Sequence, residues 1–509
     1  MASVFMVTGV LSVAATPSAV AATPLIGQTL NVALPVDAGT LDPRLAQDTS
    51  AEAVDSLIFD PLIRLNNNLG YVPTLATSWK QVNPTTWDFF LRKGVTFSNG
   101  QPFTAADVVY TFTTILDPSF HAPYISLYTP IKSVTALNDY EVQFTLSAPY
   151  APFLSYMTMG IVPHLTAGNA DFATHPIGTG PYVLKSWQRN SEISLSRNST
   201  FWGARPYAQY INFFVMPDTT SQVNALTSGT LNLITSPLPP QDVITLEHNP
   251  SVVVRKETGL GVVYFNINQK DPIMKDLAVR EALNDLTNRQ AITQKITDGI
   301  DSPAATMLMP GTWAYTRSIA IPKFSVAAAE KVLNADGWHK NSKGVMTKNG
   351  KTLTITLSTY NDPEREQILT YEQGVLAQAG IQAKISIQDW ATFIAGVMAH
   401  KYQVALMGWL GLTDPDRGMY GQFVTGQGNN WEQFSNPQVD KLLTEARQTV
   451  GNAQRKALYV QASQIILKDL PYIVISDQGW VVITGKNVQG ATLNRTGSFY
   501  FLTQVWLSN

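Results

Sequence analysis

The chain has 509 residues, more than the ~250–300 at which a single hydrophobic core stops growing, so its length predicts two or three packed domains. Hydrophobic residues make up 45% and charged residues 14%, a balance typical of an ordered globular protein. The formal net charge of −2 predicts no basic surface for nucleic acid. Because the chain contains no cysteine, disulfides, thiolate metal sites, cysteine nucleophiles and a lipidated cysteine anchor are excluded.

Residues 1–22 differ in character from the rest of the chain. They carry no charge, run through mainly apolar residues from Val4 to Val13, and end in Ala19-Val20-Ala21. An apolar core followed by a small-x-small site is typical of a secretory signal peptide, which we expect to be cleaved after Ala21 or Ala22. No later segment has the roughly 18 consecutive apolar residues of a membrane span, so we expect no membrane insertion of the mature chain. A large secreted protein without cysteine fits a bacterial periplasm.

Strand and helix patterns alternate between Lys351 and Asp416. Leu353, Ile355 and Leu357 alternate with polar residues and predict a strand that ends at Tyr360-Asn361. A helix should follow, with Asp362 as its N-cap, Pro363 in its first turn and Gly380 at its left-handed end. A second alternating strand over 383–388, a short helix over 391–399 and a continuous apolar strand over 404–407 complete a β-α-β-α-β order.

This order predicts a ligand site. Crossover connections make strands of one sheet parallel, and parallel strands place their carboxyl ends at one edge, where ligands of open α/β sheets bind. The residues that follow the three strands are Tyr360-Asn361, Trp390 and 409–416. We therefore expect them to converge in space.

The remainder of the chain reads as mixed α/β, with a further helix signature at Val279, Ala282, Leu283 and Leu286. Two apolar β-like stretches, Gly261–Ile267 and Tyr472–Gly485, bracket the segment just described. As a hypothesis they are the crossings between two lobes. The first lobe then comprises residues 23–260, completed by 485–509, and the second comprises 261–484, with a ligand cleft between them.

Sequence signatures of enzymes are weak. The six histidines, His121, His164, His175, His248, His339 and His400, include no pair at the i,i+4 spacing of a helical metal site. No Gly-x-Ser-x-Gly, phosphate-binding loop or dinucleotide fingerprint occurs. Asp414 and Asp416 offer two carboxylates, as a glycosidase requires, but Asp414-Pro415 is more typical of a turn. A secreted hydrolase stays the alternative of another class.

A set of short motifs, in order along nearly the whole mature chain, resembles a known family. The motifs are Gly39-Thr40-Leu41-Asp42-Pro43, the segment 73–79 (PTLATSW), the segment 87–108 (WDFFLRKGVTFSNGQPFTAADV), the segment 176–182 (PIGTGPY), the segment 279–283 (VREAL) and Gly408-Trp409. Together they are similar to the peptide-type extracellular solute-binding proteins of ABC importers, solute-binding family 5, which includes oligopeptide- and dipeptide-binding proteins.

The resemblance implies an α/β, two-lobed periplasmic-binding-protein fold of the Venus-flytrap type, with an extra domain of about residues 45–180 in the first lobe. Such a protein closes around a small-molecule or peptide ligand and delivers it to the permease subunits of the importer. It is not an enzyme and needs no cofactor. We expect a monomer, because both lobes must face the permease.

Two departures from the family pattern concern the ligand. In peptide binders of this family an Asp soon after the Gly-Trp pair receives the ligand ammonium, whereas this chain has Leu410-Gly411-Leu412-Thr413. In the dipeptide-binding branch an Arg near the end of the strand before the Tyr-Asn turn grips the ligand carboxylate, and Ser358 stands there instead. Each loss removes a charge-assisted hydrogen bond of about 1.5–3 kcal/mol, which argues against a standard free dipeptide.

The expected ligand-binding residues follow from the strand ends and the motifs, and are Gly39, Thr40, Tyr360, Trp390, Trp409, Leu410, Gly411, Asp414 and Asp416. For Trp390 and Trp409 we favour ligand contact over core packing. Asp414, Asp416, Arg365 and Arg417 could replace the missing charged groups, although helix capping and surface exposure explain them about as well.

The sequence leaves the ligand open. A peptide, a modified peptide or an opine fits the family, and an oligosaccharide is suggested by Trp390, Trp409, Trp431 and the Asn429-Asn430 pair. Nickel and haem are disfavoured by the few histidines and the missing cysteine.

Overall fold

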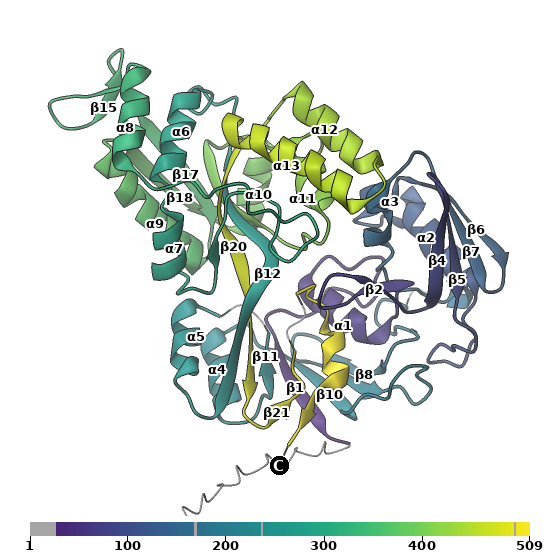
Figure 1. Cartoon of the computed structure of the whole chain (residues 1–509). Coiled ribbons are helices and arrows are strands. Elements are labelled where there is room, and N and C mark those ends of the chain that lie inside the picture. Colours follow the sequence, from purple (N-terminus) through teal and green to yellow (C-terminus); the bar gives the residue numbers. More distant parts are fainter. Residues whose placement is uncertain (1–26, 167–170, 236–237, 493–494, 509) are drawn as a thin grey trace, which may run out of the picture.

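The computed structural model describes residues 27–166, 171–235, 238–492 and 495–508. The signal peptide predicted over residues 1–22 lies outside these ranges. A mixed sheet runs through the molecule (Figure 1). Its strands, in spatial order, are β18 (Gln382–Gln388), β17 (Thr354–Tyr360), β19 (Val404–Trp409), β12 (Val252–Ile267), β20 (Tyr472–Gly485), β11 (Leu233–Ile234), β1 (Thr29–Leu34), β10 (Tyr210–Val215), β9 (Glu192–Arg197) and β8 (Tyr182–Gln188), and β13 (Ser302–Pro303) also pairs with β20.

The long strands β12 and β20 connect two bodies of the molecule. They pair antiparallel from Val252 opposite Gly485 to Asn266 opposite Tyr472, with register shifts between Thr258 and Gly261 and between Val263 and Tyr264. Figure 1 shows both strands passing from the lower body to the upper one. We call the lower body, which contains β1 and β8–β11, the first lobe, and the upper body, which contains β17–β19, the second lobe. Lobe boundaries near residues 260 and 485 stay a prediction.

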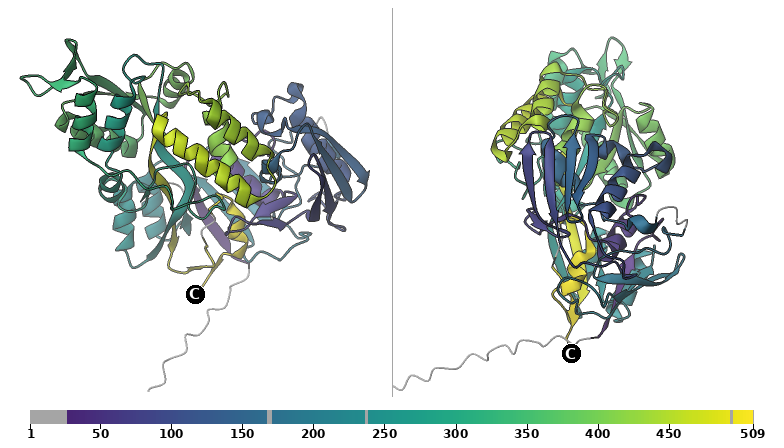
Figure 2. Two further views of the ribbon diagram at one scale, coloured as in Figure 1. Left: turned by 45° about the horizontal axis from the view of Figure 1, so that its top comes forward. Right: turned by 90° about the vertical axis from the view of Figure 1, so that its right-hand side faces the viewer.

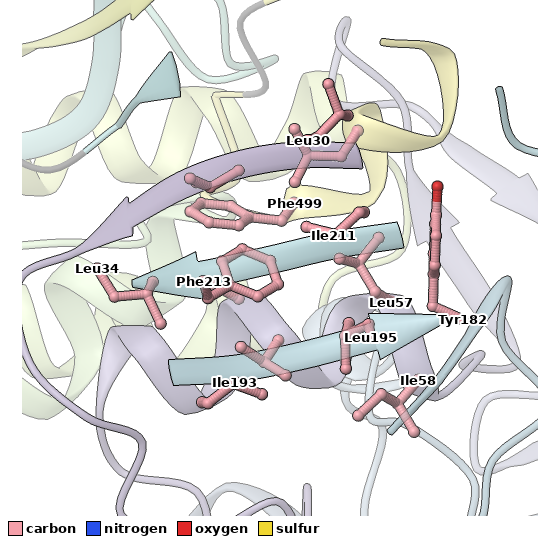
Figure 3. Close-up of a cluster of buried hydrophobic side chains, with 14 of the residues drawn as sticks. Leu30, Leu34, Leu57, Ile58, Tyr182, Ile193, Leu195, Ile211, Phe213 and Phe499 are labelled. Carbon is pink, nitrogen blue, oxygen red and sulfur yellow. The ribbon is translucent and has the colours of Figure 1, made fainter. Parts of the chain in front are cut away.

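The first lobe has an apolar core on each face of its half of the sheet. On one face, helix α1 (Thr49–Ile58) and the 3-10 helix η4 (Phe499–Gln504) cover the strands, and Leu57, Phe213 and Phe499 pack together there (Figure 3). Helices α4 (Thr219–Thr227) and α5 (Pro240–Glu247) contribute Leu226, Val243 and Leu246 to the core on the other face. The C-terminal segment therefore belongs to the core of the first lobe.

The second lobe also carries helices on both faces of its half of the sheet. On one face lie α6 (Leu277–Leu286), α7 (Arg289–Lys295), α8 (Val326–Ala335) and α9 (Pro363–Gln378), and on the other lie α10 (Trp390–Met398), α11 (Pro415–Phe423), α12 (Pro437–Gln448) and α13 (Asn452–Asp469). A small hairpin sheet of β14 (His339–Lys340), β15 (Met346–Lys348) and β16 (Lys351–Thr352) projects beside α8 (Figure 1).

An additional domain is built around a separate four-stranded antiparallel sheet. Its elements are β4 (Ala76–Asn83), β5 (Thr86–Leu91), β7 (Glu141–Leu146), β6 (Ile131–Asn138), α2 (Ala105–Leu116), α3 (Ile125–Tyr128), η1 (Pro118–Phe120) and η2 (Ala151–Tyr156). The buried residues of its core run from Leu62 to Ile161. In the right-hand view of Figure 2 this sheet stands in front of the two lobes. The smaller elements β2 (Ile63–Leu65), β3 (Tyr71–Pro73), η3 (His164–Thr166), β21 (Val488–Gln489) and β22 (Trp506–Leu507) complete the chain.

The β-α-β-α-β order predicted between Lys351 and Asp416 is confirmed. Strand β17 pairs in parallel with both β18 and β19. The Asp362 carboxylate accepts a hydrogen bond from the backbone N–H of Arg365 and caps α9, and Gly380 follows that helix with a φ of +81°. Helix α10 begins at Trp390, one residue earlier than predicted, because Asp389 caps it by accepting from Thr392 N–H. The helix predicted around Val279 and Leu286 is α6.

None of the helices within the described ranges is both long and apolar enough to cross a membrane.

Candidate functional site

The strand directions place loops of the two lobes opposite each other. Strand β1 is parallel to β11, which is antiparallel to β20, so β1 runs in the direction of β12, toward the second lobe. Strand β19 is antiparallel to β12, so β17, β18 and β19 all run toward the first lobe. The carboxyl ends of β1 and of these three strands therefore face one another. We call this region the inter-lobe edge.

On the side of the second lobe, the inter-lobe edge exposes large apolar side chains. Trp390 is 55% exposed and meets Tyr360 edge to face, with 5.0 Å between the ring centroids. Leu410 is also 55% exposed, and the half-buried Trp409 packs against Trp431 at 6.2 Å between centroids. The predicted convergence of Tyr360 with Trp390 is thus observed as direct ring contact. Apolar side chains exposed at the ends of neighbouring strands can serve as a binding surface.

On the side of the first lobe, the loop after β1 is held in place by Asp48. One carboxylate oxygen of Asp48 accepts from the backbone N–H of Gly39 (3.0 Å) and the other accepts from Ala51 N–H (2.7 Å) as the N-cap of α1. The Thr40 hydroxyl accepts from Asp42 N–H at 3.1 Å. Gly39 and Thr40 are at least partly exposed, so this fixed loop presents backbone and small side chains to the inter-lobe edge.

Asp414 and Asp416 are buried and paired with arginines. Arg455 donates two hydrogen bonds to Asp414, from Nη1 to Oδ2 (3.1 Å) and from Nη2 to Oδ1 (2.8 Å). Arg447 likewise donates to Asp416 from Nε (3.0 Å) and Nη2 (2.7 Å). Asp414 also caps α11, so these carboxylates tie α11 to α12 and α13. A ligand that bound either one would have to compete with a bidentate ion pair.

Charges of opposite sign lie on the two sides of the inter-lobe edge. Arg417 of α11 lies beside Gly411, since its Nη2 would be 3.7 Å from a Cβ built there. Burial raises the pKa of Glu52 on α1 above its ordinary value, and the nearby Arg417 offsets part of this rise. Within the part of the chain that the structure describes, no salt bridge of 4 Å or less joins the two. The second lobe thus presents a cation toward a carboxylate of the first lobe.

Arg365 is a second cation at the inter-lobe edge. Its side chain lies against Gly408, is 7% exposed, and donates from Nε to the Tyr360 hydroxyl at 2.6 Å. Burial alone would lower the pKa of Arg365, but Tyr360, Asp362 and Glu364 together raise it, so the guanidinium stays charged. Its Nη1 has no hydrogen-bond partner among the described residues. Burial and the neighbouring Asp301 raise the pKa of Glu364 to about 7.

Acidic residues at the junction between the lobes were not among the predicted site residues. Asp301 accepts from the Ser476 hydroxyl (2.7 Å) and from Gly479 N–H (2.8 Å), which fixes the segment before β13 to β20. Asp477 directly follows Ser476 in strand β20. The signal that sequence reasoning could have used is an acidic residue two positions after the apolar run Tyr472–Ile475.

The described residues contain no group of three or more His, Cys, Asp and Glu side chains that could hold a metal ion. The Nδ1 of His400 is 3.0 Å from the carbonyl oxygen of Trp431, whose ring packs against Trp409.

Comparisons with known proteins agree with this architecture. The family model of bacterial extracellular solute-binding proteins, family 5 Middle, matches residues 70–431. The oligopeptide-binding protein AppA of Bacillus subtilis is 28% identical over 91% of this chain and 88% of its own length. Protein XP55 of Streptomyces lividans is 30% identical over 90% of this chain and 85% of its own length. The nickel-binding periplasmic protein of Escherichia coli is 26% identical over 89% of this chain and 90% of its own length.

Solved structures give the same result. Bacillus subtilis AppA in complex with a nonapeptide superposes with a TM-score of 0.81 at 26% identity, over 96% of this chain and 100% of that one. NikZ of Campylobacter jejuni in complex with Ni(L-His) superposes with a TM-score of 0.82 at 25% identity, over 94% of this chain and 99% of that one. The predicted two-lobed α/β fold is confirmed. The chain belongs to family 5 of the bacterial extracellular solute-binding proteins, the family that its sequence motifs resemble.

Proposed function

We propose that this protein is the substrate-binding component of an ABC importer, secreted to the periplasm, which captures a peptide or peptide-like solute at the inter-lobe edge and delivers it to the permease. Relatives named for oligopeptides, di- and tripeptides, dipeptides and glutathione support a peptide-like ligand. These relatives are named as binding proteins, which supports a role without catalysis.

The observation that carries the proposal is the exposed apolar surface of Trp390 and Leu410 at strand ends that face Gly39 and Thr40. A flat aromatic surface can pack against the side chains or backbone of a solute. The opposite loop supplies polar backbone groups that can bind the amides of a peptide. A solute between the two would contact both lobes.

Contacts to both lobes are what a closing protein requires. A ligand shifts the equilibrium between open and closed forms only by the free energy of contacts that the closed form alone provides. The attraction between Arg417 and the carboxylate of Glu52 could be strengthened by closure or intercepted by a charged solute.

A thermal-shift screen tests the proposal. The mature protein, stripped of any copurified ligand by unfolding and refolding, is screened against peptides, opines, oligosaccharides and nickel complexes, and mass spectrometry then identifies the stabilising compound. A peptide at 100 times its dissociation constant should add about 2.7 kcal/mol to the free energy of unfolding. Trp390→Ala serves as the control with a damaged site.

Two results would contradict the proposal. Stabilisation by an oligosaccharide or a nickel complex alone would keep the family role and replace the ligand class. Conversion of the stabilising compound to a product, abolished by substituting a residue of the inter-lobe edge, would make the protein an enzyme.

A further inference from the structure

A cavity of about 240 Å³ lies in the second lobe between β20 and the loop that joins β13 to α8. At roughly 30 Å³ for each molecule of liquid water, this volume is sufficient for an alkylammonium or guanidinium group. The lining residues are Pro303, Ala304, Ala305, Thr306, Leu308, Tyr315, Thr316, Arg317, Ile319, Ala320, Ile321 and Asp477. Most of these residues are apolar or uncharged. The charged ones are Asp477 and Arg317.

Asp477 differs from the other buried acids at this junction. Its side chain lies in β20 opposite Val262 of β12 and Ser302 of β13, and it is 5% exposed. Its Oδ1 is buried without a partner, and no described residue donates a hydrogen bond to either oxygen of its carboxylate. Asp301, by contrast, has a partner on each oxygen. A buried carboxylate without donors is costly unless a cation or a proton neutralises it.

The charged groups around Asp477 do not neutralise it. The carboxylate of Asp301 adds a like charge, and burial together with Asp301 raises the pKa of Asp477 to about 8. Arg495 acts in the opposite direction, but its Nε donates to the carbonyl of Thr258 (2.9 Å) and its Nη2 to that of Pro310. Arg317 lines the cavity on its exposed loop. Across the described chain, no cation forms a salt bridge with Asp477 within 4 Å.

The cavity lies on the same face of the sheet as the aromatic residues of the inter-lobe edge. Val262 pairs with Asp477 on one side and with Trp409 on the other, and Val262, Leu308 and Trp409 share one hydrophobic cluster. With neighbouring strands about 4.8 Å apart, the backbone of Asp477 lies about 10 Å from that of Trp409. This distance is within the reach of one peptide side chain or of a chain terminus of a peptide.

We propose that Asp477 is the anchor for a positively charged group of the solute, an ammonium or guanidinium that enters this cavity. The inference deepens the proposed function and rests on it for the identity of the solute, but not for the presence of a cation site. A cation there supplies the donors that the carboxylate lacks. Arg317 at the cavity would favour a solute that also carries an acidic group.

The first experiment uses a probe that does not depend on peptide binding. n-Butylammonium chloride and its neutral counterpart n-butanol are compared by thermal shift on wild type, Asp477→Asn and Asp301→Asn. We expect n-butylammonium alone to raise the melting temperature of wild type, Asp301→Asn to retain this response, and Asp477→Asn to lose it. Asp477→Asn keeps the side-chain volume and introduces no charge, so the variant should fold. Equal responses of wild type and Asp477→Asn to n-butylammonium overturn the inference.

The second experiment uses trialanine and N-acetyltrialanine and separates this inference from the proposed function. We expect at least a tenfold preference of wild type for the free amine, reduced to less than twofold in Asp477→Asn. If wild type and Asp477→Asn bind trialanine and N-acetyltrialanine with the same affinities, the cation site is overturned and peptide binding stays intact. A response to n-butylammonium that depends on Asp477, without binding of any peptide, would keep the cation site and contradict the peptide ligand.

Discussion

The Asp414 carboxylate lies between a helix that it caps and the Arg455 guanidinium that binds both of its oxygens, and each of the two side chains is 4% exposed. Burial raises the pKa of the neighbouring Asp416, which Arg447 and then Arg455 act to lower. These two pairs hold the segment that follows Trp409.

Asp414→Asn tests whether this acid is structural. The amide keeps the helix cap but leaves Arg455 as a buried charge without a counter-ion, so we expect a loss of about 3–5 kcal/mol in the free energy of unfolding. Urea unfolding measures this loss, and ligand affinity should change less than threefold at a temperature where the variant is folded. Unchanged stability together with lost affinity would place Asp414 in the ligand site instead.

Trp390→Ala should reduce solute affinity at least tenfold and cost less than about 1 kcal/mol of stability, because the exposed ring loses little burial. Trp409→Ala should reduce affinity as well but cost more stability, since Trp409 packs against Trp431. Calorimetric titration and urea unfolding give the two quantities. An unaltered affinity with a large fall in melting temperature would make either tryptophan a core residue.

Arg365 should bind an acidic group of the solute through its unpartnered Nη1. For Arg365→Met we expect the preference for a peptide with a free C-terminal carboxylate over its amidated form to fall at least tenfold, while Arg365→Lys retains part of it. Fluorescence titration with the two peptide forms measures the ratio. The same ratio in all three proteins would remove Arg365 from the site.

Stability should fall as the pH rises from about 4.5 to about 8. Burial raises the pKa of Glu372 and of Glu432 to about 8, and Thr287 and Arg289 only partly offset this for Glu372. In that window the folded protein binds more protons than the unfolded chain, so the free energy of unfolding decreases by up to about 1.4 kcal/mol per pH unit for each group.

Glu432→Gln tests this dependence, because its amide oxygen can still accept from the Asn266 side chain, which donates to Glu432 at 3.0 Å. Urea unfolding at pH values across the window should give a shallower slope for the variant than for wild type. Parallel curves would show that Glu432 does not titrate there.

We also expect the boundary between the lobes to lie at the register shift in β12 between Thr258 and Gly261. Hydrogen exchange of backbone amides should be faster there than in the flanking paired residues, and should slow when a solute closes the lobes. Fast exchange confined to the middle of residues 261–484 would contradict this boundary.

Sequence patterns predicted the second lobe best, because its signals are local. Alternation, capping by Asp362 and the glycine at 380 define β17, α9 and β18 within one stretch of chain, and parallel pairing follows from their order. The ion pairs of Asp414 and Asp416 could not be predicted in the same way. Their partners Arg455 and Arg447 lie more than thirty residues away on α13 and α12, and no local pattern specifies which arginine reaches which acid.

Asp477 escaped prediction for a related reason. A single acid in an apolar strand gives no sign of whether a donor will reach it from elsewhere, and here the nearby Arg495 instead donates to backbone carbonyls. The Asp477 carboxylate therefore lacks a hydrogen-bond donor among the described residues, and only the folded structure shows this.

Strands β12 and β20, which connect the lobes, are hydrogen-bonded to each other, so they form one two-stranded ribbon and not two independent connections. A ribbon bends far more easily across its face than within its plane. The lobes should therefore approach each other along essentially one path, and a single donor–acceptor fluorophore pair, with one dye on each lobe, would suffice to follow solute capture in time.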